Sequence, residues 1–249
     1  MDVSRFFELS NTLQELCISS GERIFDLSSA KLLAAFISEK IGGEVVAVDM
    51  WAKEILQWKS LLSIAHSGKR FWKRRLLLGV MDGRALPFPD SEFDKIYSIS
   101  VIEHIPEDGD GKAVIELARI LKPGGVLVLT VPYSNTYWEE YVGKEIYGEG
   151  REPAKSVFFA RYYDEDSLMK RLISPSELQL HRKQYFTEML FSFNQFYDRF
   201  FPFSMLFAPL FPVLYWINVK EVSSQTIKQK KMVPKDTHVS ITLIKPKRT

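Results

Sequence analysis

Three aspartates follow apolar segments that have the length and composition of β-strands. Asp26 ends a run that begins at Arg23, Asp49 follows the β-branched run 44–48, and Asp82 follows the apolar run 78–81. Carboxylates accept hydrogen bonds from the hydroxyls of a ribose and from an amino group. Acids at successive strand ends therefore predict a site for an adenosine, and their negative charge would attract a positively charged ligand.

The spacing of these acids helps to decide between a nucleotide site and a simpler structural role. Asp49 and Asp82 could each do no more than cap the next helix. However, Asp26 and Asp49 are separated by roughly the 20 residues that lie between a nucleotide-binding turn and a ribose-binding acid in a βαβ unit. The joint spacing favours the nucleotide interpretation.

The elements that position these acids occur in the order of a parallel sheet with crossover helices. A leading amphipathic helix is predicted over 4–18, and the stretch from Leu78 to Pro132 predicts two strands, a helix stopped by the Lys122–Gly125 turn, and a third strand. In such sheets the ligand lies at the carboxyl ends of the strands. The residues expected to line that crevice are Met81-Asp82, Ser100 to His104, and Pro132-Tyr133. The first βαβ unit is predicted as a strand over 23–27, a helix over about 30–41, a strand over 44–48 and a helix over 51–64.

The second half of the chain has weaker patterns. Residues 138–161 show little periodicity and predict a loop or lid over the crevice, and Asp164 should cap a short helix. Alternation over 178–186 and 237–244 predicts two closing strands.

Three motifs occur in a fixed order within residues 21–132. They are Asp82-Gly83-Arg84-Ala85-Leu86-Pro87-Phe88, then Phe93-Asp94-Lys95-Ile96 with Glu103-His104-Ile105, and finally Arg119-Ile120-Leu121-Lys122-Pro123-Gly124-Gly125. Each motif alone is a weak signal. Together they resemble the class I S-adenosylmethionine-dependent methyltransferases, in particular the small-molecule type 11 group.

The resemblance implies a Rossmann-like α/β fold: a mostly parallel seven-stranded sheet with helices on both faces and the last strand antiparallel. It also implies S-adenosyl-L-methionine as the cofactor, with Asp49 on the ribose hydroxyls and Asp82 on the adenine amino group. The cofactor-binding residues expected on this basis are Asp26, Ser28, Ser29, Ala30, Asp49, Met50, Met81, Asp82, Gly83, Ser100 and Val101.

The turn after the first strand departs from the family pattern. Where the family has D-x-G-x-G-x-G, this chain has Asp26-Leu27-Ser28-Ser29-Ala30-Lys31-Leu32. Small residues at 28 and 30 still allow close approach, and the two serines could cap the helix and offer hydroxyls to the methionine carboxylate. The expectation is either modified cofactor binding or a lost cofactor, with the crevice blocked by Leu32 or Lys31.

Methyl transfer is an in-line displacement, so holding the acceptor against the sulfonium provides most of the acceleration. His104 is the candidate general base, because histidine titrates near neutrality and this one follows a strand at the crevice. The alternative is that it only hydrogen-bonds the next turn. Tyr133, Tyr162 and Tyr163 are candidate substrate contacts, with ordinary packing as the alternative. The histidines are scattered and predict no metal site.

The composition is that of a soluble globular protein long enough for one large α/β domain. A formal net charge of +2 is too small to predict a nucleic-acid partner. Cys17 is the one cysteine, so no internal disulfide can form, and the N-terminus lacks the apolar run of a signal peptide. These features predict a cytoplasmic protein.

An apolar, uncharged segment occupies residues 200–219. Its length would suit a transmembrane helix, but Pro202, Pro209 and Pro212 interrupt it, and a crossing would separate the final strand from its sheet. We expect either a wall of a hydrophobic substrate pocket or a patch that contacts anionic membrane through residues 200–235; a buried helical hairpin is the alternative. The predicted single domain, 1–249, has a core over about 20–135 and 176–249, a lid over 136–175 and an apolar insertion over about 189–220.

These features lead to one main hypothesis, a methyltransferase that transfers a methyl group from S-adenosylmethionine to a small acceptor, apolar or lipid-linked. The alternative is a non-catalytic, methyltransferase-like binding or regulatory protein associated with a membrane surface. Cofactor binding separates the two.

Overall fold

The computed structural model describes residues 4–65, 75–143, 156–188, 213, 217–223, 227 and 237–247. The candidate site and both core clusters lie within these ranges. Most of the apolar segment 200–219 and most of the proposed membrane-contact region 200–235 lie outside them. In the described part, no helix has the length and apolar character needed to cross a membrane.

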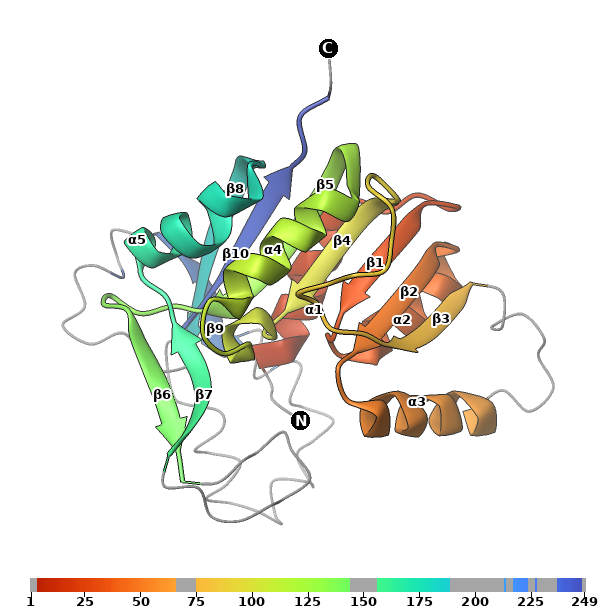
Figure 1. Ribbon diagram of the computed structural model, residues 1–249, viewed down its shortest axis with the longest axis horizontal. Coiled ribbons are helices and arrows are strands. Elements are labelled where there is room, and N and C mark those ends of the chain that lie inside the picture. The colour runs from red at the N-terminus through yellow and green to blue at the C-terminus, as the bar shows by residue number, and fades with distance from the viewer. Residues whose placement is uncertain are drawn as a thin grey trace.

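An eight-stranded sheet organises the fold, with the strand order β3-β2-β1-β4-β5-β10-β8-β9 (Figure 1). Neighbours from β3 to β5 pair in parallel, whereas β10 pairs antiparallel with both β5 and β8. The strands are β1 (Arg23–Leu27), β2 (Glu44–Asp49), β3 (Leu76–Val80), β4 (Phe93–Ile99), β5 (Leu121–Pro132), β8 (Gln179–Glu188), β9 (Val219–Val222) and β10 (His238–Ile244). The Rossmann-like fold with an antiparallel inserted last strand is therefore confirmed. The one difference is an additional edge strand, β9, at the end of the predicted apolar insertion.

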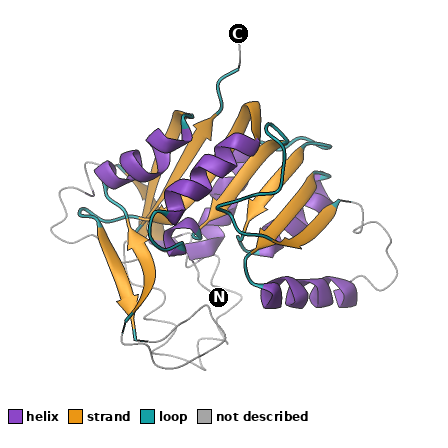
Figure 2. Ribbon diagram, in the orientation of Figure 1, coloured by secondary structure: helices purple, strands orange, loops and turns teal. Residues whose placement is uncertain are grey.

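Helices cover both faces of this sheet, as Figure 2 shows. One face packs on α1 and α2 through a core that includes Leu16, Leu33 and Ile37. The other face packs on α4 and η4 through a core that includes Leu117 and Leu172. The helices are α1 (Ser4–Leu16), α2 (Lys31–Phe36), η1 (Ile37–Ile41), α3 (Ala52–Ala65), η3 (Ile102–His104), α4 (Gly109–Ile120), α5 (Glu165–Ser167), η4 (Leu168–Ile173) and α6 (Ser174–Ser176).

Polar side chains on α1 fix this helix across the sheet. The buried Glu8 carboxylate accepts hydrogen bonds from the Ser100 hydroxyl at 2.7 Å and the Thr130 hydroxyl at 2.9 Å. Asn11 donates to the Ser240 hydroxyl at 2.9 Å. The contacts tie the first helix to β10 and β5 and to the end of β4, and so place a carboxylate close to the carboxyl ends of the central strands.

The predicted lid does not form the expected irregular loop at its beginning and end. Instead β6 (Trp138–Val142) and β7 (Val157–Tyr162) pair as an antiparallel two-stranded sheet that projects from the main sheet (Figure 1). Aromatic pairs across the two strands stabilise it: Trp138 stacks on Tyr162 with ring centroids 4.0 Å apart, and Tyr141 contacts Phe158. The prediction of a loop over 138–161 was wrong at both ends because cross-strand aromatic pairing leaves no simple alternation in the sequence.

A buried ionic network attaches this hairpin to the main domain. The fully buried Arg161 of β7 donates to the carbonyls of Ile105 and Glu107, in the turn before α4. Asp110, also buried, accepts from Tyr163 at 2.9 Å and from two nitrogens of Arg171 at 2.7 Å. Arg161 Nη1 also lies 3.9 Å from Asp110 Oδ1, so two guanidinium groups and a phenol meet on one carboxylate.

The short helix after the hairpin begins as the sequence predicts. Asp164 accepts from the backbone N–H of Ser167, and the Ser167 hydroxyl completes a capping box. The cap satisfies backbone donors at the start of α5.

Replacing Asp110 by alanine should lower the free energy of unfolding by about 3 kcal/mol, because the change removes the carboxylate that is ion-paired with the buried Arg161 and leaves the buried Tyr163 phenol without its acceptor. Urea denaturation measures this free energy. Asp108→Ala removes an exposed carboxylate two residues earlier and should leave stability nearly unchanged. Equal effects of the two substitutions would contradict the network's role.

Candidate functional site

The turn between β1 and α2 keeps the backbone conformation that glycine would favour, although the glycines are replaced. Ser28 has a φ of 55°, in the left-handed region, and its N–H donates to the carbonyl of Val48 at 2.9 Å. This bond ties the turn to the end of β2 beside Asp49. Since a non-glycine residue in this region costs about 1 kcal/mol or more, the surrounding contacts must hold it there.

Asp26 holds the turn from beneath. Its side chain is fully buried, and Oδ1 accepts from the Ser29 N–H at 2.9 Å. Burial raises the pKa of this carboxyl, while the Lys31 charge and the Ser29 hydrogen bonds act in the opposite direction. Burial and the neighbouring Asp26 charge also raise the pKa of the Tyr97 phenol well above its usual value.

The serine hydroxyls of the turn do not cap the helix, which corrects the expectation from sequence. Ala30 is the N-cap residue of α2, and no side chain bonds there. The buried Ser29 hydroxyl instead accepts from the Ile99 N–H at 2.8 Å, which links the turn to the end of β4. Its second polar neighbour is the carbonyl of Leu27, at 3.4 Å.

Lys31, the first residue of α2, folds back over this turn. Its side chain is only 2% exposed, and Nζ donates to the Ser29 carbonyl at 2.9 Å. The same nitrogen lies 3.6 Å from Asp26 Oδ2 and 3.9 Å from Asp49 Oδ2. An ammonium group therefore lies between the first two acids of the predicted site. Leu32, by contrast, is 52% exposed and points away from the core.

Asp49 ends β2 at the same edge of the sheet. Its Oδ1 accepts from the Trp51 N–H at 3.0 Å, and its side chain remains 13% exposed. Met50 and Trp51, which follow, are among the exposed large apolar residues. One oxygen of Asp49 thus bonds the backbone just after β2, while the carboxylate remains partly accessible to solvent.

Asp82 follows β3 and is held by a residue of its own motif. Arg84 donates to both carboxylate oxygens, from Nε at 3.0 and 3.1 Å and from Nη2 at 2.7 Å. These hydrogen bonds keep the pKa of Asp82 below its usual range. Gly83 lies directly against Leu27 of β1, where a Cβ would come within 2.9 Å of a methyl group, and Met81 packs against the core.

Ser100 and Val101 lie after β4, at the point where the chain turns into η3. Ser100 has a φ of 48° and its hydroxyl donates to Glu8 of α1. Glu8 was missed by sequence reasoning, since an acid on an amphipathic helix gives no sign that it will be buried at a strand end 92 residues away in the sequence.

His104 ends η3 and contacts the hairpin. Its Nδ1 lies 2.6 Å from the carbonyl oxygen of Phe159 in β7. Because a carbonyl only accepts, Nδ1 carries the proton in this contact. Nε2 then faces the buried Glu103 carboxylate at 3.8 Å. The His104 ring thus hydrogen-bonds the hairpin.

The three candidate tyrosines have different surroundings. Tyr133 and Tyr163 are buried, and burial together with the charges of Glu165 and Asp164 raises the pKa of Tyr133 to about 12. Tyr162 is half-buried on the hairpin, where its hydroxyl donates to Glu140 at 3.0 Å. The described geometry therefore brings Tyr162, but not Tyr163, toward a surface of the hairpin.

Glycine at position 28 should raise the free energy of unfolding by about 1 kcal/mol, because it removes the left-handed strain of Ser28. Thermal or urea unfolding of Ser28→Gly measures the change. Ser134→Gly is the matched control: Ser134 is not among the positive-φ residues, so glycine there should destabilise by about 0.5 kcal/mol through the unfolded chain. A loss of stability in Ser28→Gly would show that the turn is not strained.

Comparison with known proteins finds similarity to methyltransferases. Residues 27–129 match a family described as a methyltransferase domain. A 2-methyl-6-phytyl-1,4-hydroquinone methyltransferase from Synechocystis sp. is 36% identical over 86 residues, 30% of this chain and 25% of that protein. A demethylmenaquinone methyltransferase from Parafrankia sp. is 28% identical over 136 residues, 51% of this chain and 52% of that protein. The matches thus span only a quarter to about half of these relatives.

Solved structures share the fold over nearly the whole chain. A 1,6-didemethyltoxoflavin-N1-methyltransferase from Burkholderia thailandensis, solved with bound 1,6-didemethyltoxoflavin and S-adenosylhomocysteine, has a TM-score of 0.59 and 13% identity; the match covers 98% of this chain and 78% of that one. At this identity the likeness shows the fold alone. Residues 27–129 are thus similar to the methyltransferase-domain family, and the chain has the Rossmann-like fold that this solved methyltransferase also has.

Proposed function

We propose that this protein binds S-adenosylmethionine and transfers its methyl group to a small, apolar acceptor. The observation that carries the proposal is the retained geometry of the turn after β1. Ser28 keeps a left-handed backbone conformation, and its N–H bonds the carbonyl of Val48 at the end of β2. The next residue, Asp49, has a partly accessible carboxylate at the carboxyl edge of the sheet. A family match over 27–129 supports the same activity.

The residues at this edge fit the adenosine part of the cofactor. Asp49 would accept the ribose hydroxyls, and Asp82 would accept the adenine amino group beside Arg84. The turn 28–30 would approach the amino-acid part through its backbone. Once bound, the cofactor supplies an electrophilic methyl group on a positively charged sulfur. The chain's own residues then orient the acceptor and exclude water.

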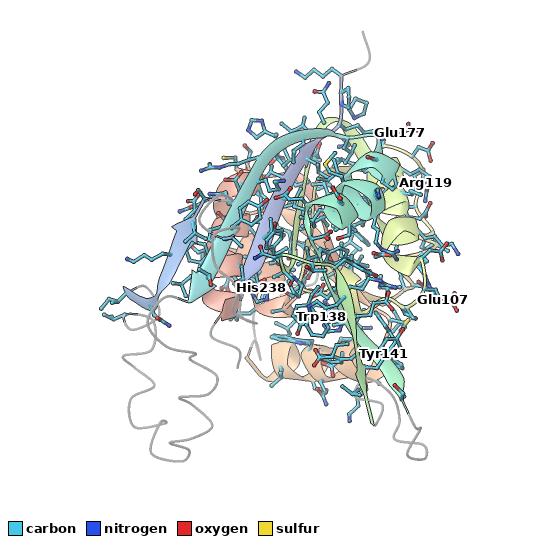
Figure 3. All side chains as sticks on the ribbon, turned by 90° about the vertical axis from the view of Figure 1, so that its left-hand side faces the viewer. Glu107, Arg119, Trp138, Tyr141, Glu177 and His238 are labelled. Carbon is cyan, nitrogen blue, oxygen red and sulfur yellow. The ribbon has the colours of Figure 1, made fainter. Side chains whose placement is uncertain are left out.

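An apolar aromatic acceptor suits the hairpin that adjoins η3. Trp138 and Tyr162 form a stacked pair on this hairpin, and Figure 3 shows Trp138 at its start and Tyr141 further out. Phe159 packs against the His104 ring, with centroids 5.0 Å apart. Two relatives carry names that specify a hydroquinone and a demethylmenaquinone, which are aromatic or quinonoid substrates of those proteins. This supports an acceptor with a ring that stacks on such side chains.

For an acceptor that must lose a proton, we propose His104 as the base. With Nδ1 held by the Phe159 carbonyl, the neutral ring has Nε2 as its proton-accepting atom. Glu103, 3.8 Å from Nε2, would stabilise the imidazolium that results. The hairpin contact therefore sets the tautomer that a base requires.

A second candidate is a binding protein that has lost the cofactor. It is supported by the two cations already placed on the cofactor acids, Lys31 beside Asp49 and Arg84 on Asp82. Calorimetric titration separates the two candidates: a folded protein that binds neither S-adenosylmethionine nor S-adenosylhomocysteine would overturn the methyltransferase proposal.

Asp49→Asn should weaken cofactor binding about 10- to 100-fold, because a neutral amide replaces a charged acceptor of hydroxyl hydrogen bonds. Isothermal titration calorimetry with S-adenosylhomocysteine measures the dissociation constant. Glu44→Gln, an equivalent change at the exposed opposite end of β2, should leave it unchanged. Unaltered affinity in Asp49→Asn would remove Asp49 from the site.

His104→Asn separates catalysis from attachment of the hairpin. The asparagine Nδ2 can replace Nδ1 in donating to Phe159, but no atom replaces the titrating Nε2. If His104 is the base, turnover should fall about 10²–10⁴-fold while the dissociation constant for the cofactor stays the same.

The matched control is His181→Asn, at an exposed position on β8, which should retain full turnover. Wild-type turnover in His104→Asn would mean that the ring only anchors β7.

A further inference from the structure

Lys31 is a charged side chain that the proposed reaction does not use, yet it is almost completely buried. Its Nζ is within 4 Å of two carboxylates, Asp26 and Asp49, and donates to the Ser29 carbonyl. A lysine is buried to this extent only when it is paired, because the loss of hydration of an ammonium is costly. The contacts around Nζ therefore form a cation site that the chain fills with its own residue.

The position of this cation coincides with the part of the proposed site where the cofactor's own positive charge would lie. A cofactor that places its ribose on Asp49 and its amino-acid part on the turn 28–30 must hold the sulfonium between them, since the sulfur links the two parts covalently. Lys31 Nζ lies between Asp49 and that turn. Two positive charges cannot share this space without strong repulsion.

We propose that Lys31 is a built-in competitor of the cofactor, which must swing out of the site when S-adenosylmethionine binds and which lowers the preference of the site for a positively charged ligand. This inference rests on the proposed function. Lysine suits the role because its four-carbon stem is flexible and its ammonium is readily rehydrated at the surface. The cofactor's cation then takes over the neutralisation of Asp26 and Asp49.

Competition by a cation makes a prediction about charge. S-adenosylmethionine carries a positive sulfonium, whereas S-adenosylhomocysteine has an uncharged thioether at the same place. Lys31→Met removes the charge and keeps the length of the side chain. It should tighten the binding of S-adenosylmethionine at least about tenfold, and that of S-adenosylhomocysteine by a smaller factor. The ratio of the two dissociation constants, measured by calorimetry, should therefore shift toward the charged ligand.

The control is Lys40→Met, which removes an exposed lysine from the end of the same helical segment and should leave both dissociation constants unchanged. An S-adenosylmethionine affinity in Lys31→Met that equals or falls below that of the wild type would overturn the inference while leaving the proposed function intact. Failure of wild type and variant alike to bind either ligand would overturn both.

A second measurement uses the wild-type chain and so does not depend on how the variant folds. Reductive methylation of lysines, followed by mass spectrometry, reports how accessible each amine is. Lys31 should react at least about tenfold more slowly than Lys40 in the free protein, because its amine is buried and ion-paired. Saturation with S-adenosylmethionine, which brings the positive sulfonium, should raise the Lys31 rate toward that of Lys40. An unchanged or lower rate would show that Lys31 stays in place, contrary to the inference.

Discussion

A buried carboxylate at the end of β1 is the constraint on which the site depends. Asp26 has no access to water, so its charge must be balanced from within the chain. The Ser29 N–H and the Lys31 ammonium provide this balance, and both come from the five residues that follow it. Satisfying Asp26 therefore curls the chain into a tight turn and begins α2 beside the end of β2. The turn conformation at Ser28 follows from the same requirement.

A parallel sheet gives this turn its neighbours. Because β1, β2 and β4 run in the same direction, their carboxyl ends meet at one edge, and the turn bonds to two of them through Ser28 and Ser29. The Glu8 carboxylate of α1 lies at the same edge, where it accepts a hydrogen bond from the Ser100 hydroxyl after β4. Four segments thus converge on one edge of the sheet, although the described residues include no group of side chains that could hold a metal ion and their one cysteine is free.

The main features of the sheet could be predicted because strand and helix periodicity repeat over long, well-punctuated segments. Asp49 and Asp82 were found at strand ends because their positions follow from strand length alone. The roles of Lys31, Arg84 and Glu8 could not be predicted in this way. Each role depends on the direction of a side chain, which the hydrophobic periodicity of the sequence does not specify. Lys31 was foreseen only as a steric block, and its pairing with two acids depends on a turn of the backbone. The hairpin β6–β7 escaped prediction because aromatic stacking, as between Trp138 and Tyr162, holds its strands without alternation.

The pairing of Lys31 with Asp26 and Asp49 stabilises the turn, but it also opposes binding of the proposed ligand. The positive charge of that ligand removes this conflict. Without a cation, Asp26 and Asp49 would face each other across a buried turn, so the free protein gains from having Lys31 there. A neutral ligand would have to displace Lys31 and leave both acids without compensation. A ligand with its own positive charge replaces one cation by another. Asp26 and Asp49 therefore pair with Lys31 in the free protein and with the ligand in the complex. The glycine-poor turn is therefore compatible with a cofactor site, provided that the cofactor is cationic.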